Sequence, residues 1–215
     1  MKLLILCAKV IMAGVNYPIS KRIEDIIGSI IGIIIILPFL PFILIAIKLE
    51  YPRERILVRL PRVSEGKTIS VYKFRNMIPN ADKLKNNLIH LNERKDGPFF
   101  KISRDPRVTP VGRILRKFRI DEFPQIINVF KGELSLVGPR PHEPGEVSKY
   151  PERYKHICLE RAGLTGHSQI NGASSLPFLK ELELDNFYIN NKSLWLDLKI
   201  LIKTFFILFS DPTAV

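Results

Sequence analysis

An uncharged run over residues 26–47, interrupted near its middle by Pro38 and Pro41, constrains this chain more than any other feature. About 22 apolar residues are enough for one helix to cross a bilayer. Two prolines close together remove backbone hydrogen bonds and bend a helix. Basic residues flank the run on both sides, yet a single crossing would put only one flank on the cytoplasmic face, which positive charge favours. The flanking residues are Lys21 and Arg22 before the run, and Lys48, Arg53, Arg55, Arg59 and Arg62 after it.

A segment that enters and leaves the membrane on the same side satisfies both constraints. We therefore predict a re-entrant helix-break-helix anchor whose break lies at Pro38 and Pro41. An ordinary spanning helix with a proline kink is the alternative, because such kinks are tolerated in membranes. In the re-entrant arrangement, everything after residue 48 lies on the cytoplasmic side.

Length and charge limit the classes of protein and partner. The chain has 215 residues, which is room for one domain in addition to the anchor. Its net charge of +12 favours anionic partners, which include lipid head groups, nucleic acid and phosphorylated small molecules. Cys7 and Cys158 lie too far apart in the sequence to form a metal or redox motif.

The first residues, MKLLILCAKVIMAG, are similar to a short signal peptide. Lys9 interrupts their apolar stretch, however, and the long apolar run follows closely. We therefore favour an interfacial amphipathic segment over a cleaved signal.

Local patterns predict a mixture of short strands and helices. Residues 54–61 and 66–77 read as two strands joined at residues 64–66, with the first strand ending at Pro61. Asn80 is a candidate cap for the first predicted helix after this hairpin. Turn residues dominate the segment 131–146, where prolines and glycines are frequent. The predicted helices cover residues 80–94, 123–130 and 147–160, and residues 163–175 are expected to form a loop with a short strand.

The tail over residues 193–209 is amphipathic and aromatic. Its apolar stripe suits a helix lying in a membrane interface, and a helix packed into the protein core is an equal alternative. The stripe consists of Trp195, Leu198, Ile202, Phe205 and Phe209.

Two adjacent acids, Asp121 and Glu122, mark the chemical centre of the sequence. Pro124 supports a helix start, where backbone N–H groups favour anions. By itself this pair is typical of a capping acid on an ion-paired helix face. The basic residues that precede it are Arg113, Arg116, Lys117 and Arg119.

A second element strengthens the functional interpretation. Arg140 lies between two prolines in GPRP, and a guanidinium on a stiff backbone is a good receptor for phosphate oxygens. Lys73 and Arg75 in YKFR add cations from a strand end, although alternating basic residues usually mark a solvated strand face. Several cations around two carboxylates suit a diphosphate substrate with a divalent ion.

The same segments carry a resemblance to the bacterial sugar transferase family, the monotopic polyprenyl-phosphate phosphoglycosyl transferases. It extends from Lys21 to about Leu208, and an insertion after the second strand is similar to the long, hexose-phosphate members. The resemblance leans toward glucose or galactose over an acetamido sugar. The segments that carry it are KRIEDIIG, GKTISVYKFRNM, DPRVTPVGRILRKFRIDEFPQIINVFKGELSLVGPRP, LTGHSQING and NKSLWLDLKIL.

The resemblance implies a two-step transfer. Asp121 would attack the sugar-bearing phosphate of a UDP-sugar, release UMP, and pass the sugar phosphate to undecaprenyl phosphate. Glu122, with Asp121, would bind Mg²⁺. Arg116, Arg140 and Lys73 match family cations that contact phosphate.

We therefore predict an α+β protein with a short β-hairpin, several helices and interfacial amphipathic helices. Residues 1–20 form the interfacial segment, 21–50 the re-entrant helix, and 51–215 a cytoplasmic catalytic domain ending in an interfacial helix. The expected location is the cytoplasmic face of the bacterial inner membrane, in contact with membrane lipids.

Two other classes of function are weighed. One is a non-catalytic, membrane-bound nucleotide or phosphate sensor on the same scaffold. The other is a nucleic-acid binder, which the charge alone suggests; no recognised motif supports it, so we expect no nucleic acid as partner. The sequence leaves a homodimer open.

Overall fold

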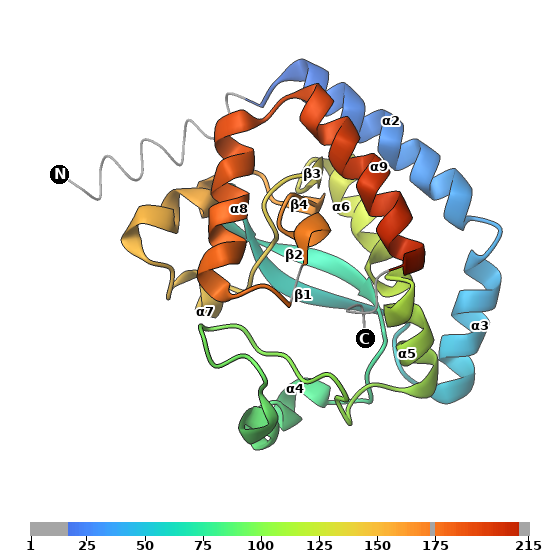
Figure 1. Cartoon of the computed structure of the whole chain (residues 1–215). Helices are drawn as coiled ribbons and strands as arrows, with labels where there is room; N and C mark the ends of the chain where they lie inside the picture. The colour runs from blue at the N-terminus through green and yellow to red at the C-terminus, as the bar shows by residue number, and fades with distance from the viewer. Residues whose placement is uncertain (1–16, 173–174, 211–215) are drawn as a thin grey trace.

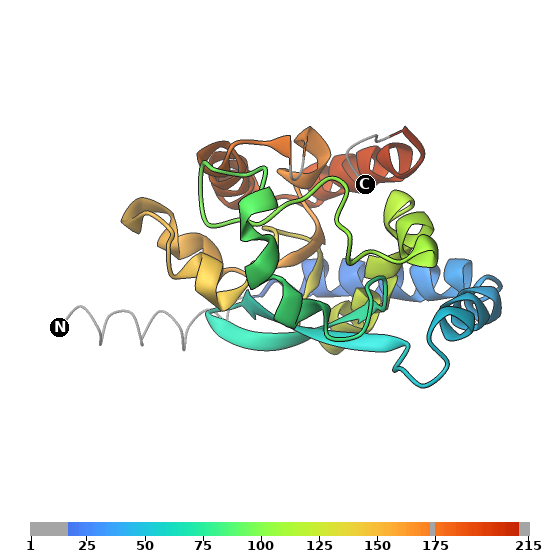
Figure 2. The same cartoon turned by 90° about the horizontal axis from the view of Figure 1, so that it is seen from below.

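The computed structural model describes residues 17–172 and 175–210, without the side chains of the last three. It combines many helices with two small sheets, as the α+β prediction requires. In Figure 2 the hairpin of β1 (Leu57–Ser64) and β2 (Lys67–Phe74) lies along one side, while α8 (Phe178–Asn191) and α9 (Leu194–Ser210) lie along the opposite side. The predicted N-terminal interfacial segment and Cys7 fall largely or wholly on residues 1–16, outside the described residues.

Two helices separated by a sharp break occupy the predicted membrane segment. α2 spans Ile19–Ile36, α3 spans Leu40–Glu50, and the pair is bent by 66°. Pro38 lies in the break and Pro41 in the first turn of α3, where a missing N–H costs nothing. No helix in the described part is long and apolar enough to cross a membrane alone, but this bent pair passes by length and composition together. The break is confirmed, and the re-entrant path stays a prediction.

The side chains of α2 are arranged with polar groups inside and apolar groups outside. Lys21, Asp25 and Ser29, spaced four residues apart, are buried against the rest of the protein. The opposite face exposes a row of isoleucines, a surface that soluble proteins rarely leave open. Lys21 at the start of α2 pairs with Asp197 at the start of α9, 2.6 Å away, and both helices appear at the same edge of the molecule in Figure 1. The exposed residues of α2 are Ile19, Ile23, Ile27, Ile30, Ile31, Ile33, Ile34 and Ile35.

The predicted hairpin is confirmed, with Ser64 opposite Lys67 at its tight end. The prediction that the first strand ends at Pro61 is wrong, because β1 continues three residues further to Ser64. The N–H of Val63 points away from β2 and donates to the carbonyl oxygen of His142, 3.0 Å away. Pro61, two residues earlier, faces the same outer side, so its missing N–H removes no bond between the strands.

The outer edge of β2 is closed by one side chain. Asn128 lies on α6 (Ile126–Lys131), and its amide oxygen accepts the N–H of Tyr72 at 3.0 Å. Its amide nitrogen donates to the carbonyl oxygen of Ser70 at 2.9 Å. The side chain therefore satisfies the backbone groups that a third strand would otherwise pair with.

The helix predicted over residues 80–94 is replaced by two shorter elements. They are α4 (Ala81–Leu84) and the 3-10 helix η1 (Asn86–Leu91). Asn80 has a left-handed backbone and its side chain makes no capping hydrogen bond. The leucines of this segment do not pack into the core, since Leu84 and Leu91 are exposed. Without such packing, a helix of this length is marginal.

Prolines also divide the helix predicted over residues 147–160. The structure has α7 (Pro144–Val147), then the 3-10 helix η3 (Glu152–Leu159), with Pro151 at the start of η3. Helix α5 covers Pro110–Lys117. The helix predicted over 123–130 is α6, and it follows the 3-10 helix η2 (Ile120–Gln125).

The core contains a second small sheet, in which β3 (Ser135–Val137) and β4 (Gly163–Thr165) pair in parallel. The short strand expected within residues 163–175 is confirmed as β4. β3 was not predicted, and it lies in the segment where turn residues dominate. Gly138 and Gly163 allow the chains to approach, since a Cβ on Gly163 would lie 2.1 Å from the nitrogen of Gly138. Helix α8 was not predicted. The 3-10 helix η4 (Gln169–Asn171) completes the described elements.

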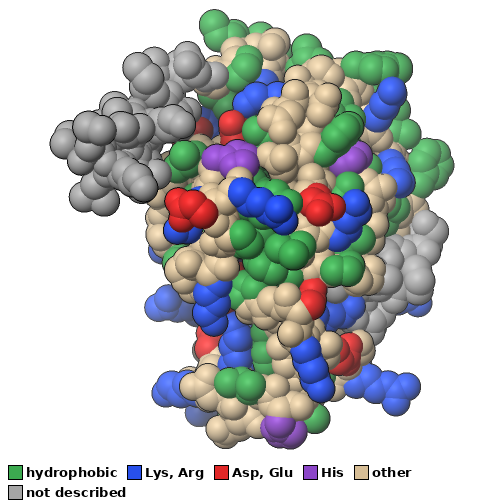
Figure 3. Space-filling model, turned by 60° about the vertical axis from the view of Figure 1, so that its left-hand side comes forward, with side chains coloured by type: hydrophobic (Ala, Val, Ile, Leu, Met, Phe, Trp, Pro, Cys, Tyr) green, Lys and Arg blue, Asp and Glu red, His purple; other side chains and the backbone are tan. Residues whose placement is uncertain are grey.

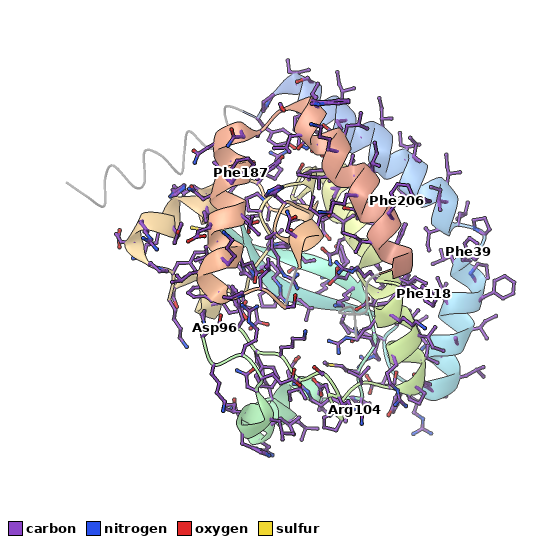
Figure 4. The ribbon with its side chains drawn as sticks, in the orientation of Figure 1. Phe39, Asp96, Arg104, Phe118, Phe187 and Phe206 are labelled. Carbon is purple, nitrogen blue, oxygen red and sulfur yellow. The ribbon has the colours of Figure 1, made fainter. Side chains whose placement is uncertain are left out.

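The C-terminal helix α9 agrees with the predicted amphipathic tail and combines the two alternatives. Ile200 is fully buried in the core, so one face packs on the protein. The predicted stripe faces outward: Trp195, Leu198, Ile202 and Phe205 are exposed. In Figure 4, Phe206 on α9 lies on the same side of the molecule as Phe39, at the α2–α3 break, and Phe118.

Candidate active site

The acid pair lies in η2, directly after α5. Arg119 joins the two elements with a left-handed backbone (φ 53°), which ends α5 and turns the chain. Such a conformation is costly for a residue other than glycine and persists where the surroundings impose it. Asp121 is 2% exposed and Glu122 is half-buried, so the turn presents one deep and one accessible carboxylate.

Two donors from β2 and its extension hold Asp121. The Lys73 Nζ atom lies 2.8 Å from Oδ2 of Asp121 and 3.4 Å from Oε1 of Glu122. The amide nitrogen of Asn76 donates to the same Oδ2 at 2.6 Å. Lys73 thus bridges the two acids. The sequence predicted that this lysine contacts phosphate, and in this structure it pairs with both carboxylates.

Close packing of α5 fixes Asn76 in turn. The N–H of Thr109 donates to the Asn76 carbonyl oxygen at 3.1 Å. A Cβ added to Gly112 would lie 2.0 Å from that oxygen, so this position of α5 needs a glycine. The hydroxyl of Thr109 caps α5 by accepting the N–H of Gly112 at 2.9 Å.

The accessible acid is surrounded by positive charge. Burial alone would raise the pKa of Glu122, but the charges of Lys73, Arg140 and Arg119 outweigh it and lower the pKa to about 2. Glu122 is therefore a carboxylate at every physiological pH.

Arg140 reaches the site from the turn after β3. Its backbone N–H donates to Asp185 on α8 at 3.2 Å, and its Nε lies 3.8 Å from Glu181 on the same helix. Within residues 17–172 and 175–210, its two terminal nitrogens have no hydrogen-bond partner. They are the two groups that would engage a phosphate.

One large cavity, of about 1260 Å³, collects all the predicted chemical residues. Arg75 lines it but is already paired, with its Nη2 3.0 Å from Glu54 and its Nε donating to the Arg55 carbonyl at 2.7 Å. Pro38 and Pro41 do not line it; they lie at the helix break. The predicted residues that meet at the cavity are Lys73, Arg75, Arg116, Asp121, Glu122 and Arg140.

The donor set is compatible with magnesium. The described residues contain no group of three or more His, Cys, Asp or Glu placed to hold a metal ion. Mg²⁺ usually takes one or two protein carboxylates and completes its shell with water and substrate phosphates. A half-buried, ionised Glu122 beside Asp121 meets that requirement.

Several residues at the site were not predicted from the sequence: Asn76, Arg94, His142, Glu181 and Asp185. Two of them carried a signal. Glu181 and Asp185 interrupt the buried face of α8, which also contains Phe178, Leu182 and Tyr188. Acids on an otherwise apolar helix face are rarely buried without a partner.

Comparison with known proteins agrees with the geometry. The family model described as bacterial sugar transferase matches residues 16–211. The chain belongs to the bacterial sugar transferase family.

Relatives in this family are similar over most of this chain. The exopolysaccharide production protein ExoY of Sinorhizobium fredii is 33% identical, with 86% of this chain and 84% of that protein aligned. The undecaprenyl-phosphate galactose phosphotransferase of Salmonella typhimurium is 33% identical, with 86% of this chain and 39% of that protein aligned. The UDP-glucose:undecaprenyl-phosphate glucose-1-phosphate transferase of Escherichia coli is 35% identical over 94% of this chain and 43% of its own length.

Most of these sugar transferases are longer proteins. The chain spans 39% to 42% of the length of four of them. The residues that the family model matches, 16–211, include the Asp121–Glu122 pair, the hairpin and the Arg140 turn.

Proposed function

We propose that this protein transfers a sugar 1-phosphate from a UDP-sugar to undecaprenyl phosphate in the synthesis of a surface polysaccharide or glycan. The observation that carries the proposal is the Asp121–Glu122 pair, held by Lys73 and facing Arg140 in one cavity. Family membership and the names of the relatives support the substrate classes.

In the first half-reaction, a carboxylate oxygen of Asp121 attacks the phosphorus that bears the sugar. A new acyl-phosphate bond forms, the bond from that phosphorus to the UMP oxygen breaks, and UMP leaves with the electron pair. Lys73 and Asn76 both contact Oδ2 and therefore fix the orientation of the carboxylate. Oδ1 is then the oxygen available for attack.

In the second half-reaction, an oxygen of undecaprenyl phosphate attacks the same phosphorus. The undecaprenyl-diphospho-sugar forms and Asp121 returns to its carboxylate. Arg140 and Arg116 would stabilise the charge that develops on the phosphate oxygens in both steps.

Glu122, together with Asp121, would hold Mg²⁺. When bound, the ion would neutralise phosphate charge. The depressed pKa of Glu122 supports this role, because the group needs no deprotonation before it binds a cation.

The expected location is the cytoplasmic face of the bacterial inner membrane, with α2 and α3 as a re-entrant anchor. The exposed apolar faces of α2, α3 and α9 support contact with lipid. Ser20 and Arg53, exposed at the two ends of the anchor, suit a topology test. The two native cysteines, Cys7 and Cys158, are first removed, and a new cysteine is placed at each of the two positions in turn. Both new cysteines should react with an impermeant thiol reagent only from the cytoplasmic side. Labelling of the two cysteines from opposite sides of the membrane would exclude re-entrance.

The decisive experiment is a UMP-release assay with undecaprenyl phosphate, Mg²⁺ and a series of UDP-sugars. We expect release with at least one sugar and loss of release in Asp121→Asn. Nucleotide binding without release from any UDP-sugar would contradict the proposal and favour a non-catalytic sensor.

A further inference from the structure

A buried acid on α8 links three segments that line the cavity. Glu181 is 1% exposed, whereas the charged side chains visible in Figure 3 are interspersed at the surface. Its Oε2 lies 3.1 Å from Nη1 of Arg94. Its Oε1 lies 3.3 Å from Nε2 of His142 and 3.8 Å from Nε of Arg140. The Glu181 carboxylate therefore pairs with two guanidinium groups and an imidazole.

Arg94 belongs to the insertion after the hairpin, and this segment is docked on α8. The second terminal nitrogen of Arg94 donates to the Leu176 carbonyl at 2.8 Å. Asp96 accepts the N–H of Phe178 at the start of α8; Figure 4 shows Asp96 on the loop below that helix. A Cβ on Gly97 would lie 2.5 Å from the ring of Phe178, so the loop lies directly against it.

Aromatic contacts join the same loop to the Arg140 turn. The Phe99 ring stacks on His142, with centroids 4.3 Å apart, and Arg94 lies over its ring at 4.6 Å. His142 also shares a hydrogen bond with the hydroxyl of Tyr150. Arg94, Phe99, His142 and Arg140 all line the cavity.

Arg140 lies between two acids. Glu181 lies close to the Nε atom of Arg140, and the negative charge of Glu122, which also lines the cavity, acts on the Arg140 guanidinium as well. Burial opposes ionisation of Glu181, but the hydrogen bond from His142, the charge of Arg140 and the hydrogen bond from Arg94 lower its pKa, so it keeps its negative charge. If that charge were removed, Glu122 would become the stronger attractor for the guanidinium.

We infer that Glu181 is a positioning residue, which holds the Arg140 guanidinium away from Glu122 and ready for the diphosphate of the nucleotide-sugar. The inference rests on the proposed function. Arg94 is paired with Glu181 and so does not contact the phosphate itself. By holding Glu181, it makes the insertion contribute indirectly to phosphate binding.

The test compares Glu181→Gln with Glu183→Gln in the purified full-length protein. Glu183 is exposed on the same helix and pairs with Lys180, which makes it a matched control. We expect Glu181→Gln to weaken binding of UDP with Mg²⁺, and to raise the KM for the UDP-sugar, by about tenfold or more. Glu183→Gln should change neither. Equal UDP affinity in the two variants would overturn the inference.

A double variant separates positioning from a general loss of folding. If Glu181 acts through Arg140, adding Glu181→Gln to Arg140→Ala should leave UDP affinity unchanged. If Glu181→Gln lowers UDP affinity in the Arg140→Ala background by as much as it does in the wild type, the inference is contradicted. If Glu181→Gln does not fold, Glu181→Asp takes its place, because it keeps the charge on a shorter side chain. We expect Glu181→Asp to bind UDP more weakly than the wild type, with a smaller loss than the one expected for Glu181→Gln. A UDP affinity equal to that of the wild type would argue against the inference.

The outcomes for the two proposals differ. A wild-type protein that binds UDP in a Glu181-dependent way but releases no UMP contradicts the proposed function alone. A protein that releases UMP, with Glu181→Gln equal to its control, contradicts this inference alone.

Discussion

At the scale of single residues, Lys73 is the cation in direct contact with both acids. Its ammonium group is 2.8 Å from Asp121 and 3.4 Å from Glu122, so it can balance the charge of both carboxylates and hold the proposed nucleophile in place. Arg75 and Arg140, which the sequence predicted as further cations of the site, contact neither acid directly. Arg75 pairs with Glu54, and the terminal nitrogens of Arg140 have no hydrogen-bond partner among the described residues.

Lys73→Met should therefore lower the rate of UMP release by roughly 100-fold or more, a loss typical for a preorganised charge at a reacting centre. Lys67→Met, on the exposed end of the same strand, serves as the control and should leave the rate unchanged. Comparable rates for the two variants would show that the dyad does not need its bridging ammonium.

The low pKa of Glu122 makes a prediction about stability and pH. Because the folded pKa, about 2, lies below the ordinary value of 4.5, the ionised side chain stabilises the fold above that ordinary value. This contribution is lost as the pH falls from 4.5 through 2. The difference in thermal midpoint between the wild type and Glu122→Gln should thus be constant at neutral pH and shrink in acid. A difference that persists at the lowest pH would contradict the assignment.

At the scale of elements, helix α2 is attached to the strand that leads to Arg140. The buried carboxylate of Asp25 on α2 accepts the N–H of Leu136 at 2.8 Å and the hydroxyl of Ser135 at 2.9 Å. Both residues belong to β3, and the turn with Arg140 follows it. The position of α2 relative to the site is therefore set by hydrogen bonds.

Asp25→Asn should destabilise the protein by about 1–3 kcal/mol, because the amide leaves a buried group unpaired. It should also lower the rate of UMP release through the β3 turn. Thermal unfolding and the UMP assay measure the two effects, with Asp82→Asn on the exposed face of α4 as the control. An Asp25→Asn protein as stable as this control would disprove the role of the contact.

The sequence predicted the elements and site residues that depend on local patterns. The hairpin has alternating side chains, the helix break has two prolines, and Asp121, Glu122 and Arg140 lie in short segments dense in charge and proline. It predicted a short strand within residues 163–175, which is present as β4, but it did not predict β3, because prolines and glycines dominate the segment around that strand. Nor did it predict the Arg94–Glu181 pair, since 87 positions separate its members and only the tertiary fold brings them together.

At the scale of the whole molecule, the apolar faces of α2, α3, α5 and α9 are exposed while polar side chains of α2 are buried. Ile114 and Phe118 continue this surface at α5, and Phe42 and Leu49 at α3. Such an arrangement is stable where lipid, and not water, covers the apolar side.

Ile34→Lys should consequently weaken membrane attachment. Ile34 is exposed near the end of α2, and a lysine deep in the bilayer costs roughly 2.5–3.5 kcal/mol. The fraction of protein that stays with membranes after an alkaline wash should fall in Ile34→Lys and not in Ile34→Leu. Equal retention of both variants would place this face of α2 outside the lipid.

The amide of Asn128 has a consequence for how copies of this protein meet in a crowded membrane. An unpaired strand edge would let the hairpin of one copy extend into the next and build fibres. Here a single side chain occupies the bonding groups of Ser70 and Tyr72, so a foreign strand would have to displace it before any lateral growth could begin.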